Sequence, residues 1–372
     1  MRILQLTKHY PPHIGGIETM TYDLTEGLNR AGVVCDVYCA NDHNSTEEDE
    51  VRGYKVLRAA RLAKMLSTSI APALIKSLWK VRNQYDIIHV HFPDPMSALA
   101  IYLTRPKAKI VIHWHSDIIK QKMVLKVYLP LQNWILKRAD AIIGTTSKYI
   151  NESWQLKKVV NKTTPIPIGI RPGSLVVNDA DVQMIREKYV GKRIVFSLGR
   201  LIYYKGFEYL IEAAQYLPDD VVVLIGGAGE LELKLAGMVE RLGLANKIVL
   251  LGPISHQLVG AYFKACDVFC LPSVERSEAF GIVLLEAMSF GKPIVAADIP
   301  GSGVPWVNHH HVTGLNVPVK DAKALSDGIL QILGNRPLYD QFSANAYSRF
   351  KELFTDETMV QLCIKLYHDI LS

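Results

Sequence analysis

The feature that most constrains this chain is an alternation between short runs of Val, Ile and Leu and longer segments with amphipathic spacing. The apolar runs show little polar alternation, which is typical of parallel strands covered on both faces by crossover helices. The alternation therefore predicts an α/β doubly wound fold, whose ligands bind beyond the carboxyl ends of the strands. The expected strands are residues 3–6, 33–39, 87–91, 110–113 and 141–145, then 193–198, 221–226, 248–251, 268–271 and 293–296.

The alternation is interrupted once, by a stretch rich in Pro and Gly at residues 164–173. Such a stretch is typical of an interdomain linker, and 372 residues with 49% hydrophobic content exceed one average domain. We therefore expect two Rossmann-like domains, at residues 1–170 and 175–349. The acidic segment 43–50 is interpreted as a solvated loop.

The charge is unevenly distributed between the two halves of the chain. Residues 1–170 carry 23 Lys and Arg against 14 Asp and Glu, whereas the remainder carries 19 against 22. A basic half indicates an anionic partner, either a membrane surface or nucleic acid, although an ordinary solvated face stays open. No apolar run approaches the ~20 residues that cross a bilayer, so any membrane contact is expected to be peripheral. The five cysteines lie mostly in apolar runs and predict a reduced, cytosolic protein.

Two groups after strands are suited to phosphate. Gly15 and Gly16 follow the first strand and open a helix, where backbone amides can approach a diphosphate, although a glycine pair is equally expected in any tight turn. Arg200 and Lys205 follow strand 193–198. Two cations there can neutralise a leaving nucleoside diphosphate, or they are simply surface charges.

The most specific signal is a pair of carboxylates, Glu278 and Glu286, with Phe280, Gly281 and Ile282 between them. A helix is expected to begin near Gly281, and its free amides can meet a phosphate. Glu286 lies on a very apolar helix, so its carboxylate needs donors, which a pair of ribose hydroxyls would supply. A buried salt bridge is the alternative. We favour the ligand interpretation because buried ionisable groups near clefts are often functional.

Four histidines form a second candidate group at strand ends: His89, His91, His113 and His115. We expect one of them to reach the cleft and hydrogen-bond substrate while the others pack. A zinc site with a neighbouring aspartate is the alternative. It is disfavoured because no groups that would orient such ligands are evident.

Two basic segments, 58–82 and 118–128, mix cations with apolar and aromatic residues at helical spacing. Basic amphipathic helices of this kind commonly lie on anionic membranes, although helices that pack one face on the sheet look the same. The face proposed for acceptor or membrane contains Asp117, Lys120, Lys122 and Lys126.

Taken together and in this order, these residues resemble the retaining glycosyltransferase family 4, over essentially the whole chain. The resemblance implies the GT-B fold, with two facing Rossmann-like domains and a C-terminal helix, at about 350–372, that returns to the first domain. It implies a nucleotide-sugar donor and no cofactor or metal. The acceptor hydroxyl would attack on the face that the leaving group departs from, with a phosphate oxygen as base.

The resemblance also implies a role for each site residue, with His115 and Glu278 as the catalytic candidates. One departure concerns Arg171, because relatives usually carry an acidic residue or asparagine at this position of the linker; its contacts are not predicted. The implied roles are the first glycine loop for Gly15 and Gly16, diphosphate for Arg200 and Lys205, ribose for Glu286, transferred sugar for Glu278 with the backbone of Phe280, Gly281 and Ile282, and sugar near the reaction centre for His115.

Residues 113–117, followed by a basic stretch at 120–122, are similar to bacterial O-antigen and polysaccharide enzymes, many of which are mannosyltransferases that use GDP-mannose. The expected reaction is therefore transfer of mannose from GDP-mannose to a lipid-linked oligosaccharide at the cytoplasmic face of the cell membrane, with other polysaccharide-assembly enzymes as candidate partners. The alternative is a UDP-sugar-dependent enzyme with a different or soluble acceptor. A nucleic-acid-binding protein is disfavoured, because no binding motif or aromatic stacking platform is evident.

Overall fold

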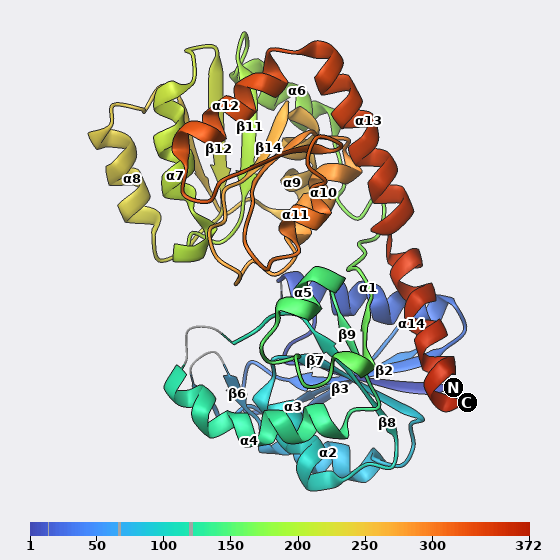
Figure 1. Cartoon of the computed structure of the whole chain (residues 1–372). Coiled ribbons are helices and arrows are strands. Elements are labelled where there is room, and N and C mark those ends of the chain that lie inside the picture. Colours follow the sequence, from blue (N-terminus) through green and yellow to red (C-terminus); the bar gives the residue numbers. More distant parts are fainter. Residues whose placement is uncertain (14, 66–67, 119–121) are drawn as a thin grey trace. The chain divides into compact units, whose positions relative to one another are not determined.

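The computed structural model describes all residues of the chain except 14, 66–67 and 119–121, and of residues 122–126 it describes the backbone only. The chain forms two compact units (Figure 1). The first contains Met1–Gly169 and Asp356–Ser372, and the second contains Ile170–Thr355. Among the described helices, none combines the length and the apolar character required to cross a membrane.

Unit 1 is built on an eight-stranded sheet in the order β10-β9-β8-β7-β1-β2-β4-β3, parallel except for the β3–β4 pair. The strand order reverses between β1 and β7, which is the switch point at which such sheets bind ligands. The strands are β1 (Arg2–Leu6), β2 (Val34–Ala40), β3 (Glu47–Val51), β4 (Tyr54–Ala59), β7 (Ile87–Phe92), β8 (Lys109–Trp114), β9 (Ala141–Gly144) and β10 (Thr163–Pro165). The helices are α1 (Gly16–Arg30), α2 (Pro72–Val81), α3 (Pro95–Thr104), α4 (Lys122–Arg138), α5 (Ser147–Glu152) and α14 (Asp356–Leu371).

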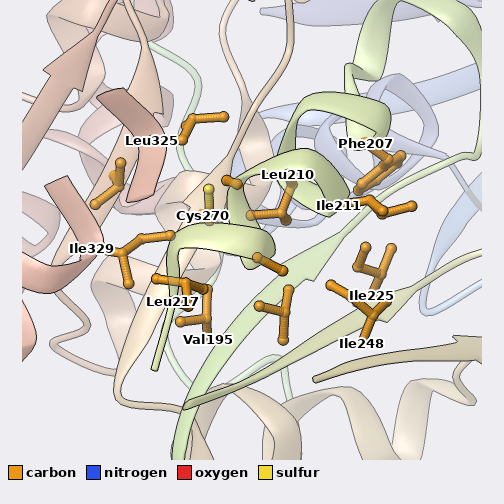
Figure 2. Packing of buried hydrophobic residues seen from close by; sticks show 14 of the residues in the cluster. Val195, Phe207, Leu210, Ile211, Leu217, Ile225, Ile248, Cys270, Leu325 and Ile329 are labelled. Atoms are coloured by element: carbon orange, nitrogen blue, oxygen red, sulfur yellow. The ribbon is translucent and has the colours of Figure 1, made fainter. Parts of the chain in front are cut away.

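Unit 2 is built on a six-stranded parallel sheet in the order β13-β12-β11-β14-β15-β16, whose order reverses between β11 and β14. One face is packed by a core in which Val195 and Ile225 of the sheet meet Phe207 and Leu210 of α7 and Ile329 of α12 (Figure 2). The strands are β11 (Arg193–Leu198), β12 (Val221–Gly226), β13 (Ile248–Gly252), β14 (Val268–Leu271), β15 (Ile294–Ala297) and β16 (Gly314–Val317). The helices are α6 (Asp179–Lys188), α7 (Phe207–Ala213), α8 (Glu232–Arg241), α9 (His256–Ala265), α10 (Ile282–Ser289), α11 (Val304–Val307), α12 (Ala322–Leu333) and α13 (Arg336–Leu353).

The C-terminal region consists of two helices that belong to different units. Helix α13 is part of unit 2, and α14 packs on α1 in unit 1. The approach of α1 and α14 is close, since a Cβ atom at Gly27 would lie 2.4 Å from Val360. Arg30 at the end of α1 also binds the buried carboxylate of Asp356 at 2.5 Å. A glycine on α1 and an ion pair at the helix ends thus hold the last helix of the chain on unit 1.

The acidic segment is not a loop throughout, which corrects the sequence-based prediction. Glu47–Val51 forms the exposed edge strand β3, paired antiparallel with β4. A two-residue turn at Arg52 and Gly53, both with positive φ, joins the two strands, as is usual for tight hairpins. Asp49 then binds Arg58 across the pair at 2.5 Å. Cross-strand ion pairs and an edge position allow a strand without an apolar face.

The basic segment 58–82 is not one amphipathic run of helix either. Its first part completes β4 and forms a small hairpin of β5 (Ala63–Met65) and β6 (Thr68–Ile70). Among the described residues of this segment, only Pro72–Val81 is helical, and Pro72 begins the helix where its missing N–H costs nothing. The helical spacing of the cations before Pro72 was therefore coincidental.

Candidate functional site

The two cations predicted to bind phosphate follow β11, at the switch point of the unit 2 sheet. Arg200 is exposed, and its guanidinium lies 3.3 Å from the hydroxyl of Tyr204. Lys205 is 8% exposed, and its Nζ atom lies 2.6 Å from Oε2 of Glu278, which follows β14 on the other side of the switch point. Ser273 donates a hydrogen bond to the same oxygen at 3.0 Å. The structure thus brings Lys205 and Glu278 together as a buried, hydrogen-bonded ion pair.

Two glycines allow the loops around this pair to approach closely. A Cβ atom at Gly206, where φ is 66°, would lie 2.2 Å from the carbonyl oxygen of Pro272. At Gly227, where φ is 136°, a Cβ atom would lie 1.9 Å from the carbonyl oxygen of Gly199. Both positions therefore require glycine. The loop after β12 supports the loop that carries Arg200 by direct backbone contact.

The predicted helix after Glu278 begins as expected at Gly281, which has a φ of 78° and precedes α10. The side chain of Phe280 is buried against Trp306 and Phe354. Only the backbone of Phe280 is therefore left for a ligand. The amide of Leu284 donates to the carbonyl oxygen of Gly281 at 2.8 Å, so the amides at the start of α10 that can bind an anion are those of Ile282 and Val283.

Glu286 lies in the second turn of α10 and is partly buried among apolar neighbours. Burial raises the pKa of its carboxyl group to about 7, and the positive charge of Lys205 opposes this increase. Within the residues that the structure describes, no side chain hydrogen-bonds to this carboxyl group. A carboxyl in this state has its oxygens available for hydroxyl donors of a ligand.

In unit 1, the glycine pair lies at the start of α1, just beyond β1. Gly15 precedes the helix with an extended backbone, and a Cβ atom there would lie 2.3 Å from the carboxylate of Glu18. Gly16 is the first residue of the helix and is exposed. Its amide and those that follow are at the positive end of a 15-residue helix.

The four predicted histidines gather into one stack, because β7 and β8 are neighbours with His91 opposite His113. All four side chains are buried, with exposures of 0 to 5%. Burial lowers the pKa of each imidazole, so all four are neutral at pH 7. His115, the proposed sugar contact, hydrogen-bonds His91 at 3.0 Å.

Three of these histidines are close enough to bind one metal ion: His89, His91 and His113 each have a ring nitrogen within 4.8 Å of the others. Both nitrogens of His91, however, already have protein partners, His115 and Gln5. The rings of His89 and His91 are nearly parallel, at 6°, whereas ligands of one metal must direct their in-plane lone pairs to a single point. His91 is therefore engaged in hydrogen bonds, whereas Nε2 of His89 and both ring nitrogens of His113 are buried without a hydrogen-bond partner among the described residues.

Asp117 is buried, so it is not part of a membrane face, and its contact with an acceptor stays a prediction. Its carboxylate is buried and accepts hydrogen bonds from Nε1 of Trp114 at 3.0 Å and from the hydroxyl of Ser153 at 2.7 Å. Asp117 therefore fixes the loop after β8. Lys120 lies outside the described residues, and Lys122 and Lys126 belong to α4 with no description of their side chains.

An exposed surface of unit 1, here named the basic-aromatic face, runs over α2, α3 and α4, which pack side by side (Figure 1). Trp79 is 56% exposed and lies under the guanidinium of Arg82, at 4.5 Å. Arg105 lies over the rings of both Tyr102 and Trp134, at 4.4 and 4.7 Å. Residues 61–138 contain 13 Lys and Arg against 3 Asp and no Glu. Two of these cations, Lys109 and Arg138, are paired with Asp140, whereas Arg82 and Arg105 lie over aromatic rings of this face.

Sequence reasoning missed three residues of the candidate site: Gln5, Tyr204 and Ser273. Gln5 carried a signal, because it is the single polar residue inside the first apolar run. Tyr204 and Ser273 carried none, since a tyrosine and a serine in loops are unremarkable until the fold brings them to Arg200 and Glu278.

Comparison with known proteins matches both units to protein families. Residues 14–173 match the family described as Glycosyltransferase Family 4, and residues 181–349 match Glycosyl transferases group 1. The chain is 33% identical to O-antigen chain mannosyltransferase C of Escherichia coli, over 100% of this chain and 99% of the relative. It is 31% identical to D-rhamnosyltransferase WbpZ of Pseudomonas aeruginosa, over 95% and 92%.

Solved structures with lower identity share the fold. Sucrose-phosphate synthase from Thermosynechococcus elongatus matches with a TM-score of 0.81 and 21% identity, over 100% of this chain and 99% of that chain. The Anabaena protein HepE, in complex with UDP-glucose, matches with a TM-score of 0.78 and 22% identity, over 99% and 100%. With the two Rossmann-like sheets, these likenesses confirm the expected GT-B fold.

Proposed function

Because this chain belongs to glycosyltransferase family 4, we propose that it transfers mannose from GDP-mannose, with retention of configuration, onto a lipid-linked glycan. The chain is a glycosyltransferase of polysaccharide synthesis; the donor, the stereochemistry and the acceptor are the proposal. The observation that carries it is the full-length similarity to an O-antigen mannosyltransferase. A rhamnosyl donor is the second candidate, favoured by the D-rhamnosyltransferase.

The proposed donor site is the group around the unit 2 switch point. Arg200, Lys205 and the first amides of α10 would bind the diphosphate, whose negative charge increases as its bond to the sugar breaks. Glu286 would accept hydrogen bonds from the ribose hydroxyls. Glu278 would bind a hydroxyl of the transferred sugar and remain within reach of Ser273. The reaction is proposed to need no metal, because Arg200, Lys205 and the N-terminus of α10 would neutralise the negative charge of the diphosphate.

The proposed chemistry needs no protein nucleophile. The acceptor hydroxyl would attack the anomeric carbon on the face that the diphosphate leaves, and a phosphate oxygen would take its proton. The residues of the chain then act by binding and orientation, with His115 near the sugar as a neutral hydrogen-bonding group.

The donor is tested by calorimetry with GDP, UDP and ADP and with their sugars. We expect GDP and GDP-mannose to bind most tightly. Transfer from GDP-mannose to a polyprenyl diphosphate-linked glycan, followed by NMR of the new anomeric centre, then tests acceptor and stereochemistry. Preference for UDP would overturn the sugar assignment, and a better rate with GDP-rhamnose would favour the second candidate.

A lipid-linked acceptor requires the enzyme to work at a membrane, and we propose that the basic-aromatic face binds the anionic cytoplasmic leaflet. Exposed aromatic residues beside arginines fit the boundary between headgroups and acyl chains. Each cation near an anionic surface contributes about 1 kcal/mol. Lys120, Lys122 and Lys126 remain part of this proposal through the sequence of α4 and the segment before it.

Vesicle binding tests this surface with a matched pair of tryptophans. Trp79 and Trp154 are 56% and 55% exposed, but only Trp79 lies on the basic-aromatic face. In co-sedimentation with phosphatidylglycerol vesicles, Trp79→Ser combined with Arg105→Ser should weaken binding roughly tenfold. Trp154→Ser should bind like the unmodified protein. Equal binding of all three proteins would refute the proposed surface.

A further inference from the structure

The histidine stack contains one continuous hydrogen-bonded chain that ends at His115. From β1, the side-chain oxygen of Gln5 lies 2.8 Å from Nε2 of His91 on β7. Nδ1 of His91 lies 3.0 Å from Nε2 of His115, which follows β8. The three side chains are 0, 2 and 5% exposed. Three segments far apart in the sequence thus meet in a water-shielded chain at the switch point of unit 1.

The geometry of the two imidazoles is that of an in-plane hydrogen bond. The ring planes of His91 and His115 are within 7° of each other, and the centroids are 5.3 Å apart. This separation equals the N···N distance plus about one ring radius on each side, so the two nitrogens lie on the line that joins the centroids. An N–H that points along this line meets the lone pair of its partner head-on, as a strong hydrogen bond requires.

The positions of the protons follow from the chemistry of Gln5. In the orientation of the Gln5 amide that this structure has, the oxygen faces His91 and can only accept, so the proton of neutral His91 is on Nε2. Nδ1 of His91 then carries a lone pair and can only accept. The bond of 3.0 Å therefore requires the proton of His115 to be on Nε2, which leaves the lone pair of His115 on Nδ1.

We infer that Gln5 and His91 are positioning residues that hold His115 in one tautomer and one ring orientation, with Nε2 protonated and Nδ1 as a hydrogen-bond acceptor. The inference rests on the proposed contact of His115 with the sugar. Because Nε2 is occupied by His91, Nδ1 is the ring nitrogen left for a ligand, and it selects a hydroxyl that donates. Burial supports this state, because it keeps both imidazoles neutral and so leaves each ring with a single proton.

Substitutions at His91 separate positioning from mere packing. His91→Leu fills the space but removes the acceptor for His115, whereas the amide oxygen of His91→Asn can replace Nδ1 as an acceptor. His89→Asn is the matched control, since it removes another buried imidazole of the stack, which hydrogen-bonds Tyr367 rather than His115. Gln5→Leu removes the group that fixes the proton of His91.

The direct measurement is NMR of the full chain with ¹⁵N-labelled histidine, in which two-bond ring correlations identify the protonated nitrogen. The resonances of His115 are assigned by their loss in His115→Gln. We expect His115 to be protonated on Nε2 in the unmodified protein, in His91→Asn and in His89→Asn, and to populate both tautomers in His91→Leu and Gln5→Leu. Protonation on Nδ1 in the unmodified protein would overturn the inference, whichever sugar the enzyme uses.

Turnover gives the second readout. For histidines that bind a metal, loss of the group that orients the ring typically costs about 10- to 100-fold, and we expect the same range here. We expect kcat to fall by this factor in His91→Leu and to recover in His91→Asn, while the Kd for GDP, which binds unit 2, stays unchanged. An unchanged kcat in a folded His91→Leu protein with mixed tautomers would refute the positioning role. If His91→Leu does not fold, Gln5→Leu provides the same comparison. Failure of GDP binding would instead count against the proposed function alone.

Discussion

Replacing Glu286 with glutamine should make unit 2 more stable and a worse nucleotide binder. Burial raises the pKa of this carboxyl group from 4.5 to about 7. Between these two pH values the folded protein keeps a proton that the unfolded chain has lost. The free energy of unfolding therefore decreases as pH rises from 4.5 to 7, and the decrease persists above pH 7. At about 1.4 kcal/mol per pH unit it amounts to about 3 kcal/mol.

Glutamine has nearly the same shape as glutamate and no charge. The free energy of unfolding of Glu286→Gln should therefore not decrease with pH in this way. The variant should resemble the unmodified protein near pH 5 and exceed it at pH 8. For a unit of this size, about 3 kcal/mol corresponds to an increase in Tm of roughly 6–12 °C. Scanning calorimetry should show the increase in the transition of unit 2. Glu240→Gln, at an exposed position on α8 of the same unit, is the control and should change neither transition.

The same substitution should weaken binding of GDP by roughly 10- to 100-fold, because hydrogen bonds from ribose hydroxyls to a charged acceptor are lost. Ribose hydroxyls stabilise the charged carboxylate, so nucleotide binding near pH 7 should release about half a proton from the unmodified protein. Calorimetry in buffers with different ionisation enthalpies measures this release. A variant that is no more stable at pH 8, or that still releases the proton, would refute the assignment of Glu286.

Three further substitutions test the surroundings of this group. Lys205→Met leaves the buried carboxylate of Glu278 with Ser273 as its one side-chain partner among the described residues; it should cost about 3–5 kcal/mol in urea unfolding and abolish measurable binding of GDP. Gly206→Ala should destabilise unit 2 by more than the ~1 kcal/mol expected for strain at Gly191→Ala, where a Cβ atom meets nothing within 4 Å. Phe280→Leu should lower the Tm through lost packing, with an unchanged Kd for GDP in calorimetry if only the backbone at this position meets the ligand.

Ten of the fourteen strands in the two sheets could be predicted from the sequence, because most of these ten are buried and apolar along their length. All ten expected strands are present. The edge strand β3 was missed for the converse reason, since four of its five residues are acidic and its stability comes from pairing with β4. The strands β4, β10 and β16 were also missed, since β4 carries Lys55 and Arg58 and the other two are only three and four residues long. The hairpin of β5 and β6 was missed because three-residue strands are too short to show a period.

The candidate site was predictable in its residues but not in its contacts. Chemistry and position relative to strands indicated Lys205 and Glu278, yet nothing in the sequence showed that they pair. Such contacts depend on which strands are neighbours, and Gln5 and His91 are 86 residues apart. Asp117 shows the opposite error in its membrane assignment, because the sequence did not indicate that its side chain is buried and hydrogen-bonded to Trp114 and Ser153.

The pairing of Lys205 with Glu278 constrains how a donor can enter the proposed site. A diphosphate that binds Lys205 must compete with a carboxylate at 2.6 Å, and Glu278 would be left with a buried charge if it had no other donor. Ser273 already donates to the same oxygen, and a hydroxyl of the transferred sugar would supply a second bond. A complete nucleotide sugar satisfies both partners at once, whereas the free nucleotide satisfies only the lysine. The exchange therefore favours the sugar-bearing donor over the free nucleoside diphosphate, which is the product of the proposed reaction.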